Sequence, residues 1–172
     1  VIVPEKQTKN ELIEMYKCDK NKIEVQPFIS ILPRHYENEK GENINYSNIF
    51  DNLNLPKDKK IIFYPSTFWA HKNHKYVLDT AHILKSKKNY DFFFVFVGQD
   101  KGNLNFIAES IKKLELDSLI KILPFSTNDE IISLYLNSSS IVMPTTGGPT
   151  NLPLYESIYF QKPIYYSDHL VI

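Results

Sequence analysis

The sequence predicts an α/β fold in which a Rossmann-like parallel sheet is sandwiched between layers of helices. From residue 61 onward, short apolar segments of strand length alternate with longer segments whose apolar residues recur at helical spacing. The strand segments are apolar at consecutive positions, as in residues 92–97, which is typical of parallel strands that helices cover on both faces. The chain has 172 residues and is 42% hydrophobic, which suits one α/β domain.

The first sixty residues give weaker signals. Residues 9–16 carry Leu12, Ile13 and Tyr16 at helical spacing, which predicts a short helix. Residues 22–27 alternate between polar and apolar side chains and predict a strand. Residues 33–59 are polar and have no sustained periodicity, so we expect a linker or a long loop there.

The remaining elements follow one another without long gaps. Strands are expected at residues 61–64, 92–97, 119–123, 141–144 and 163–166, and helices at residues 75–88, 104–116, 129–136 and 154–160. The first three helices each place apolar residues on one face. These residues are Val77, Ala81 and Leu84, then Ile107, Ile111 and Leu114, then Ile131, Leu134 and Tyr135. Thr127 or Asn128 is the expected N-cap of the third helix.

Composition narrows the class of protein. Lys plus Arg and Asp plus Glu both number 20, so a net charge of +0 favours neither nucleic acid nor an acidic membrane as the main partner. Cys18 is the only cysteine, which excludes an internal disulfide and suits the cytoplasm. No apolar run approaches the roughly 18 to 20 residues of a membrane span. The chain begins without methionine and stops just after a strand, so we expect it to be part of a longer protein.

The most informative segment is residues 145–156. It follows a buried strand, contains Gly147 and Gly148, and leads into a helix that begins near a proline. Glycines let backbone approach a ligand closely, and the free N–H groups at a helix start favour an anion. Glu156 stands about one turn inside that helix, where its carboxylate could accept hydrogen bonds from sugar hydroxyls. A nucleotide diphosphate with its ribose would satisfy both features, whereas a tight turn with a solvated glutamate is the alternative.

Three other loops follow strands of the predicted sheet and therefore lie at the same edge. Ligands bind at this edge, where the carboxyl ends of parallel strands meet. Lys72, after the first strand, could bind a diphosphate, or it could be a solvated lysine beside an N-cap asparagine. Gly98, after the second strand, could admit a ligand and Asp100 could bind a hydroxyl, with a plain turn as the alternative. Phe125, which follows Pro124 after the third strand, could pack on a nucleobase or cover the edge of the core.

A metal site is not expected. His71 and His74 are close in sequence, but no neighbouring carboxylate or cysteine completes a set of ligands.

These loops resemble the C-terminal half of a retaining glycosyltransferase with the GT-B fold, in the large family 4 (glycosyl transferases group 1). The residues that carry the resemblance are residues 71–73, Gly98 and residues 147–156, and it covers residues 60–172. Residues 1–30 resemble the end of the preceding domain. The resemblance implies that residues 1–32 are the tail of that domain or an inter-domain segment, that residues 33–59 are a linker, and that residues 60–172 hold a nucleotide-sugar.

The resemblance also implies roles for single residues. Lys72 occupies the place of a lysine that binds the diphosphate, and Glu156 matches the acid that binds the ribose hydroxyls. The expected donor-binding positions are Thr67, Gly98, Pro124, Phe125, Gly147, Gly148, Thr150, Asn151 and Leu152, the last three through backbone N–H groups. The chain departs from the family pattern at Gly148, where an acid is usual, and at Thr67, where an arginine is usual. A subset of the family carries a Gly-Pro-Thr-Asn loop, so the resemblance implies a variant enzyme.

The implied activity is transfer of a sugar, of the hexosyltransferase type, from a nucleoside-diphosphate sugar to an acceptor hydroxyl with retention of configuration. No metal or other cofactor is expected. The acceptor, a glycan or a lipid-linked glycan, would be bound by the N-terminal domain, so this part alone should transfer nothing. Surface polysaccharide or glycan synthesis in the cytoplasm, with the complete protein at the membrane surface, is the implied setting.

Two other classes of protein remain as alternatives. One is a non-catalytic module that binds a nucleotide or phosphate, which the glycine at position 148 supports. The other is a flavodoxin-like signalling domain, which would need a cluster of aspartates where residues 65–67 offer none.

Overall fold

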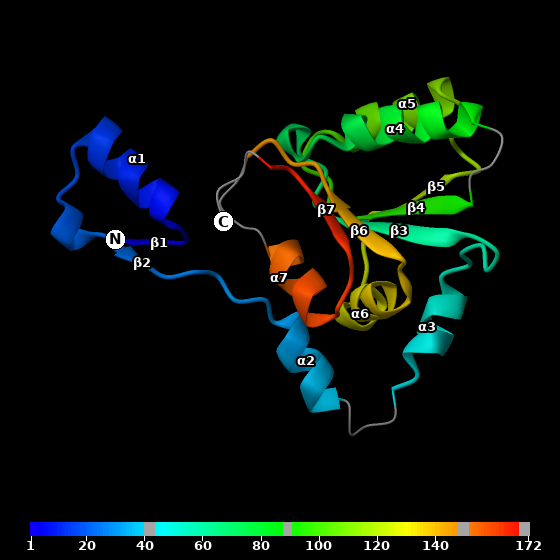
Figure 1. Cartoon of the computed structure of the whole chain (residues 1–172), viewed down its shortest axis with the longest axis horizontal. Coiled ribbons are helices and arrows are strands. Elements are labelled where there is room, and N and C mark those ends of the chain that lie inside the picture. Colours follow the sequence, from blue (N-terminus) through cyan, green and yellow to red (C-terminus); the bar gives the residue numbers. More distant parts are fainter. Residues whose placement is uncertain (40–43, 88–90, 148–151, 169–172) are drawn as a thin grey trace.

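The computed structural model describes residues 1–39, 44–87, 91–147 and 152–168. Its centre is a five-stranded parallel sheet in the order β5-β4-β3-β6-β7 (Figure 1). The strands are β3 (Lys60–Pro65), β4 (Phe92–Val97), β5 (Ile120–Leu123), β6 (Ser140–Met143) and β7 (Ile164–Tyr166). The predicted fold class and the predicted strands are therefore confirmed.

The strand order places a switch point beside β3. The chain builds β3, β4 and β5 in one direction, then returns to the other side of β3 for β6 and β7. β3 pairs with β4 along its whole length, but with β6 only at Ile62 and Phe63. In open parallel sheets the connections leave in opposite directions at such a point, and a crevice opens at the carboxyl ends of the strands.

Helices cover both faces of the sheet. α4 (His74–Ser86) and α5 (Leu104–Lys113) lie on one face, and α6 (Asn128–Asn137) and α7 (Leu152–Tyr159) lie on the other (Figure 1). A hydrophobic core lies on each face of the sheet, and alternate strand residues point into one or the other. Tyr64 and Phe96 pack with α4 and α5, and Phe63 and Val95 pack in the core beside α6. This two-sided burial explains why the strands are apolar at consecutive positions.

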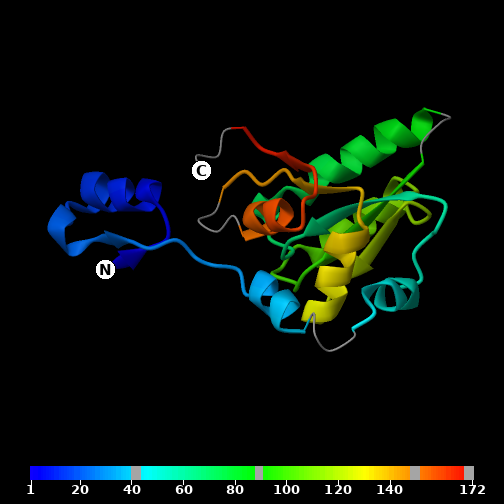
Figure 2. The same ribbon diagram turned by 60° about the horizontal axis from the view of Figure 1, so that its bottom comes forward.

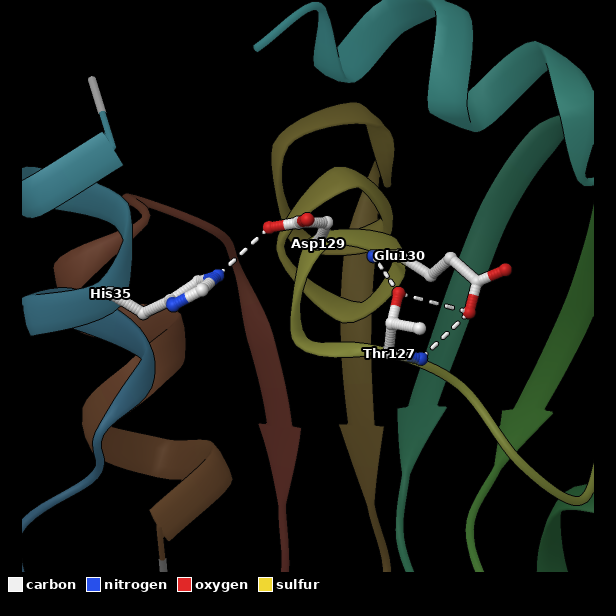
Figure 3. A network of polar contacts seen from close by, with 4 residues as sticks. All are labelled: His35, Thr127, Asp129 and Glu130. Atoms are coloured by element: carbon white, nitrogen blue, oxygen red, sulfur yellow. Dashed lines mark hydrogen bonds and ion pairs between the residues drawn. The ribbon is translucent and has the colours of Figure 1, made fainter. Parts of the chain in front are cut away.

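The start of α6 follows the sequence prediction closely. The Thr127 side chain accepts a hydrogen bond from the backbone N–H of Glu130 at 3.3 Å, and the Glu130 carboxylate accepts one from the backbone N–H of Thr127 at 2.7 Å (Figure 3). This reciprocal capping box satisfies two backbone donors that the helix itself leaves free. Thr127, and not Asn128, is the N-cap.

Residues 33–59 are not the loop that their polar composition predicts. They contain α3 (Tyr46–Asn52) and most of α2 (Leu32–Glu39), which pack beside α6 and α7. The His35 ring lies 2.8 Å from the Asp129 carboxylate at the start of α6 (Figure 3). The Tyr36 ring contacts Phe160, with ring centroids 5.6 Å apart. The apolar anchors are few and spread over two short helices, so no periodicity stands out in the sequence.

The N-terminal residues form a small unit of their own. It consists of β1 (Ile2–Val3), α1 (Lys6–Tyr16), a 3₁₀ turn (Lys20–Lys22) and β2 (Glu24–Val25), with β1 and β2 parallel. The unit stands apart from the large sheet in both views (Figures 1 and 2). The predicted helix and strand are both present, although the strand is shorter than expected. The boundaries of the predicted domains stay a prediction.

None of the helices in the described part of the chain has the length and apolar character that a bilayer span requires.

Candidate functional site

A cavity of about 420 Å³ opens at the carboxyl ends of β3, β4, β5 and β6. It lies at the switch point, where the sheet topology predicts a ligand site. Predicted site residues from separate loops meet in its wall. They are Thr67, Lys72, Gly98, Pro124, Phe125, Leu152 and Glu156. The structure thus brings the lysine and the glutamate of the proposed site into one cavity, although 84 positions separate them in the sequence.

Lys72 ends a short 3₁₀ turn (Ala70–Lys72) between β3 and α4. Its side chain is half-buried, and burial lowers the pKa of its ammonium. Among the described residues, no carboxylate lies within 4 Å of that ammonium. An ammonium that is partly desolvated and has no counter-charge is suited to bind an anion such as a diphosphate.

The alternative interpretation of this loop, a solvated lysine beside an N-cap asparagine, fits only in part, because Lys72 is half-buried and Asn73 is the N-cap of α4 by position alone. Asn73 adopts a left-handed conformation with φ 56° and makes no side-chain cap hydrogen bond. Its amide instead donates to the carbonyl of Pro144 at 3.1 Å, which ties the start of α4 to the end of β6.

One carbonyl joins the loops after β3 and β6. The oxygen of His71 accepts hydrogen bonds from the Thr146 backbone N–H at 2.9 Å, from the Thr145 hydroxyl at 3.2 Å and from the Thr146 hydroxyl at 3.1 Å. These bonds fix Lys72, the next residue, relative to the segment after β6. The described residues contain no group of three or more histidine, cysteine, aspartate or glutamate side chains placed to hold a metal ion.

Glu156 is buried on α7, with only 6% of its surface exposed. One carboxylate oxygen accepts a hydrogen bond from the Ser30 hydroxyl at 2.5 Å, and the other accepts one from the Tyr135 hydroxyl at 2.6 Å. Burial, and next the charge of Glu156, raise the pKa of Tyr135 well above its ordinary value, so the hydroxyl keeps its proton. The Glu156 side chain is therefore not solvated, as the alternative of a tight turn with a solvated glutamate requires.

Ser30 and Tyr135 are not among the predicted site residues. Ser30 is 126 positions from Glu156, in a segment without a motif. Tyr135 was assigned to the apolar face of its helix, where its ring indeed lies, and nothing in the sequence indicates what its hydroxyl reaches.

Gly98 has a structural role that the sequence did not reveal. A Cβ atom added at Gly98 would lie 2.2 Å from the backbone oxygen of Ser66 and 2.7 Å from the backbone nitrogen of Thr67. The glycine therefore admits the neighbouring chain segment, whereas the sequence suggested that it admits a ligand. It does also line the cavity.

Gly98→Ala is therefore expected to destabilise the protein by about 1–3 kcal/mol, the usual cost of forcing an atom into packed structure. Gly147→Ala is the matched control, because a Cβ atom there meets no atom of the described residues within 4 Å. Urea denaturation of the two variants measures the difference. Equal stabilities would show that the segment around Ser66 yields without cost.

The structure distinguishes between the alternatives for two other loop residues, Phe125 and Asp100. The side chain of Phe125 is 76% exposed, so it does not cover the core, and it stands at the wall of the cavity. The Asp100 carboxylate accepts hydrogen bonds from the backbone N–H groups of Gly102 at 2.8 Å and Leu104 at 3.1 Å. These bonds, that of Gly102 first, lower the pKa of Asp100. The plain-turn interpretation of Asp100 is confirmed.

The glycine-rich loop is only partly described. Gly147 is not part of the cavity wall, and its carbonyl accepts a hydrogen bond from the Thr145 hydroxyl at 2.8 Å. Gly148, Thr150 and Asn151 lie outside the described residues. Leu152 begins α7 and lines the cavity. The assignment of backbone amides in this loop to phosphate binding stays a prediction.

Several solved glycosyltransferase structures are similar to this chain. The chain superposes on a glycosyltransferase from Rickettsia africae ESF-5 with a TM-score of 0.76 at 23% identity, covering 98% of this chain. It superposes on WaaG, a glycosyltransferase involved in lipopolysaccharide biosynthesis, with a TM-score of 0.77 at 14% identity, covering 97%. For Anabaena Alr3699/HepE in complex with UDP-glucose, the TM-score is 0.76 at 14% identity, covering 98%. The chain spans 44% of the length of each of these three proteins.

A comparison with curated proteins gives no match. A comparison with protein families matches residues 45–171 to "Glycosyl transferases group 1". This match extends over most of the chain and includes the whole parallel sheet and the loops around the cavity. The chain therefore belongs to glycosyl transferases group 1, and it has the fold of the C-terminal domain of a GT-B enzyme.

Proposed function

We propose that this chain binds the donor of a retaining glycosyltransferase, a nucleoside-diphosphate sugar, in the cavity at the carboxyl ends of the strands. The observation that carries the proposal is the joint placement of Lys72 and Glu156 in the wall of that cavity. A nucleoside diphosphate carries negative charge at one end and vicinal hydroxyls nearby. A half-buried ammonium and a buried carboxylate in the same cavity match these two groups.

The residues of the chain would promote transfer through electrostatics. As the bond between the sugar and the diphosphate breaks, negative charge develops on the leaving phosphate while the sugar acquires oxocarbenium character. The ammonium of Lys72, aided by the start of α7, would stabilise that negative charge. Glu156 would orient the nucleoside and would not act as a base. Because the lysine supplies the positive charge, we expect transfer to proceed without a divalent metal.

A panel of nucleotides tests the proposal directly. UDP, GDP, ADP and dTDP are added to the chain one at a time, and its thermal unfolding is recorded. A ligand that binds the folded state raises the apparent stability, so at least one nucleotide should raise the unfolding temperature. Inorganic phosphate at the same concentration is the control. If no nucleotide stabilises the chain more than phosphate does, the proposal is wrong.

The acceptor site belongs to the proposal as well. WaaG acts in lipopolysaccharide biosynthesis, and Alr3699/HepE was solved with UDP-glucose. By analogy, we propose a glycan or a lipid-linked glycan as acceptor, in the synthesis of surface polysaccharide at the cytoplasmic side of the membrane. Residues of a second domain, absent from this chain, would bind the acceptor. We therefore expect the 172-residue chain to bind nucleotide and to transfer no sugar alone.

A non-catalytic nucleotide-binding module is the second candidate, and the glycine at position 148 favours it. Glu156→Ala in a protein that contains both domains separates the two functions. If the protein is an enzyme, the variant should lose sugar transfer by at least about tenfold, since it leaves the donor misplaced. A module would show nucleotide binding in the parent protein and no transfer with any acceptor tested.

A further inference from the structure

The carboxylate of Glu156 is held in an unusual way for a buried charge. Among the described residues, no lysine, arginine or histidine nitrogen lies within 4 Å of it. Its only hydrogen-bond donors in that part of the chain are the hydroxyls of Ser30 and Tyr135. A buried carboxylate without a cation costs free energy, and such groups are typical of functional sites.

Both hydroxyls are themselves fixed in place. The Ser30 oxygen accepts a hydrogen bond from the backbone N–H of Leu32 at 3.2 Å, where α2 begins. The Tyr135 ring is fully buried, stacks on Phe160 with centroids 5.1 Å apart, and meets the Phe63 ring edge to face. The two donors therefore reach Glu156 from different elements, and each has little freedom to turn away.

The remaining capacity of the carboxylate matches a vicinal diol. A carboxylate offers about four lone-pair sites, two on each oxygen. Ser30 uses one site on the first oxygen, and Tyr135 uses one on the second. Each oxygen keeps a further acceptor site, and Glu156 lies in the cavity wall. The 2′ and 3′ hydroxyls of a ribose are two adjacent donors that could use both sites at once.

We propose that Ser30 and Tyr135 are positioning residues that orient the Glu156 carboxylate, and that this arrangement makes the site select ribonucleotides over 2′-deoxyribonucleotides. The inference rests on the proposed function, since it needs a nucleoside diphosphate in the cavity. It narrows the donor to a ribonucleoside-diphosphate sugar and disfavours a deoxythymidine-diphosphate sugar. Without the hydroxyl at 2′, one acceptor site of a desolvated carboxylate would have no donor. An unpaired buried acceptor costs free energy, so the deoxynucleotide should bind more weakly.

Calorimetric titration with matched nucleotide pairs tests this inference. The probes are UDP with 2′-deoxy-UDP, GDP with 2′-deoxy-GDP, and ADP with 2′-deoxy-ADP, each titrated into the parent chain. We expect the pair that binds best to show a preference of at least about tenfold for the ribonucleotide. In Tyr135→Phe and Ser30→Ala the preference should fall to about twofold, mainly through weaker binding of the ribonucleotide.

Two controls separate positioning from general structural support. Ser30→Thr keeps a hydroxyl at position 30 and should restore the preference. Tyr159→Phe removes a tyrosine hydroxyl that donates to Glu37, away from Glu156, and should leave the preference unchanged. A purely structural role of Ser30 or Tyr135 would weaken both members of a pair equally.

The outcomes distinguish this inference from the proposed function. If the parent chain binds both members of a pair equally, the selection is wrong while the donor site stands. If the preference is unchanged in Tyr135→Phe and Ser30→Ala, Glu156 needs no positioning by these residues. If none of the six nucleotides binds, both proposals fall. Ser30 is only half-buried, so Ser30→Ala keeps the test decisive even if Tyr135→Phe fails to fold.

Discussion

Lys72→Ala is expected to weaken binding of a nucleoside diphosphate by about 10- to 100-fold, since hydrogen bonds to charged groups contribute about 1.5–3 kcal/mol. The effect should exceed that of a surface lysine because the Lys72 ammonium is half-buried in the cavity wall and has no carboxylate partner among the described residues. Titration calorimetry with the nucleotide that best stabilises the chain measures the loss.

Lys75→Ala is the matched control for this prediction. Lys75 lies in the first turn of α4, is well exposed, and pairs with Asp79 at 2.5 Å. Its removal changes the net charge by the same amount as Lys72→Ala, yet it should leave the affinity within about twofold because screening weakens exposed charges at a distance. Equal losses in both variants would mean that general charge attracts the nucleotide, and that Lys72 makes no specific contact.

His74 is expected to make the stability of the protein depend on pH between about 4 and 6.5. Burial, and next the charge of Lys72, lower the pKa of His74 to about 4 from its ordinary value of 6.5. In that range the unfolded chain binds the proton and the folded chain does not. Stability is therefore complete above 6.5 and falls as the pH drops towards 4, by roughly 3 kcal/mol in total.

The surroundings of His74 explain why its protonation is costly. The ring is completely buried, and neither nitrogen has a hydrogen-bond partner among the described residues. Its centroid lies 4.6 Å from that of Tyr64, 5.1 Å from that of Phe68 and 5.4 Å from that of Phe96. A charged imidazolium there would lose its hydration without gaining an acceptor.

Urea denaturation at pH 5 and pH 7.5 tests the prediction, with His74→Phe as the variant. The free energy of unfolding should fall less between these pH values in His74→Phe than in the parent chain. This comparison holds even if the larger ring lowers stability at both pH values. His82→Phe is the control, since His82 is exposed on the same helix. If the pH dependence of His74→Phe equals that of the parent, the histidine is not the titrating group.

The parallel sheet and its covering helices could be predicted because the buried positions of each strand and helix are apolar in the sequence. Residues 92–97 are apolar at every position since both faces of β4 are covered, and Ile107 and Ile111 mark the one buried face of α5. The two helices between residues 32 and 52 could not be predicted in this way. Their contacts rest on a few side chains, such as Tyr36 and the His35–Asp129 pair, whose partners are distant in sequence.

The candidate site shows the same division. That Lys72 and Glu156 lie in one cavity could be predicted, because both come from segments that follow a strand, and such segments in a parallel sheet lie at one edge. The hydrogen bonds of Ser30 and Tyr135 to Glu156 could not be predicted because they depend on packing between segments distant in sequence. The close approach of the Ser66 backbone to Gly98 could not be predicted, since a sequence cannot say whether a ligand or the chain itself occupies the space beside a glycine. The ligand contact of Gly98, which also lines the cavity, stays a prediction.

The carbonyl of His71 has a mechanical consequence. The backbone N–H and the hydroxyl of Thr146 both donate to this main-chain oxygen, and the Thr145 hydroxyl lies 3.2 Å from it, so the two loops beside it should shift as one body. The linkage uses the peptide group and not the imidazole, which means that residue 71 can change its side chain without loosening the joint. A substitution that removes the hydroxyl of Thr146, by contrast, removes one of these bonds and should displace the adjacent Lys72.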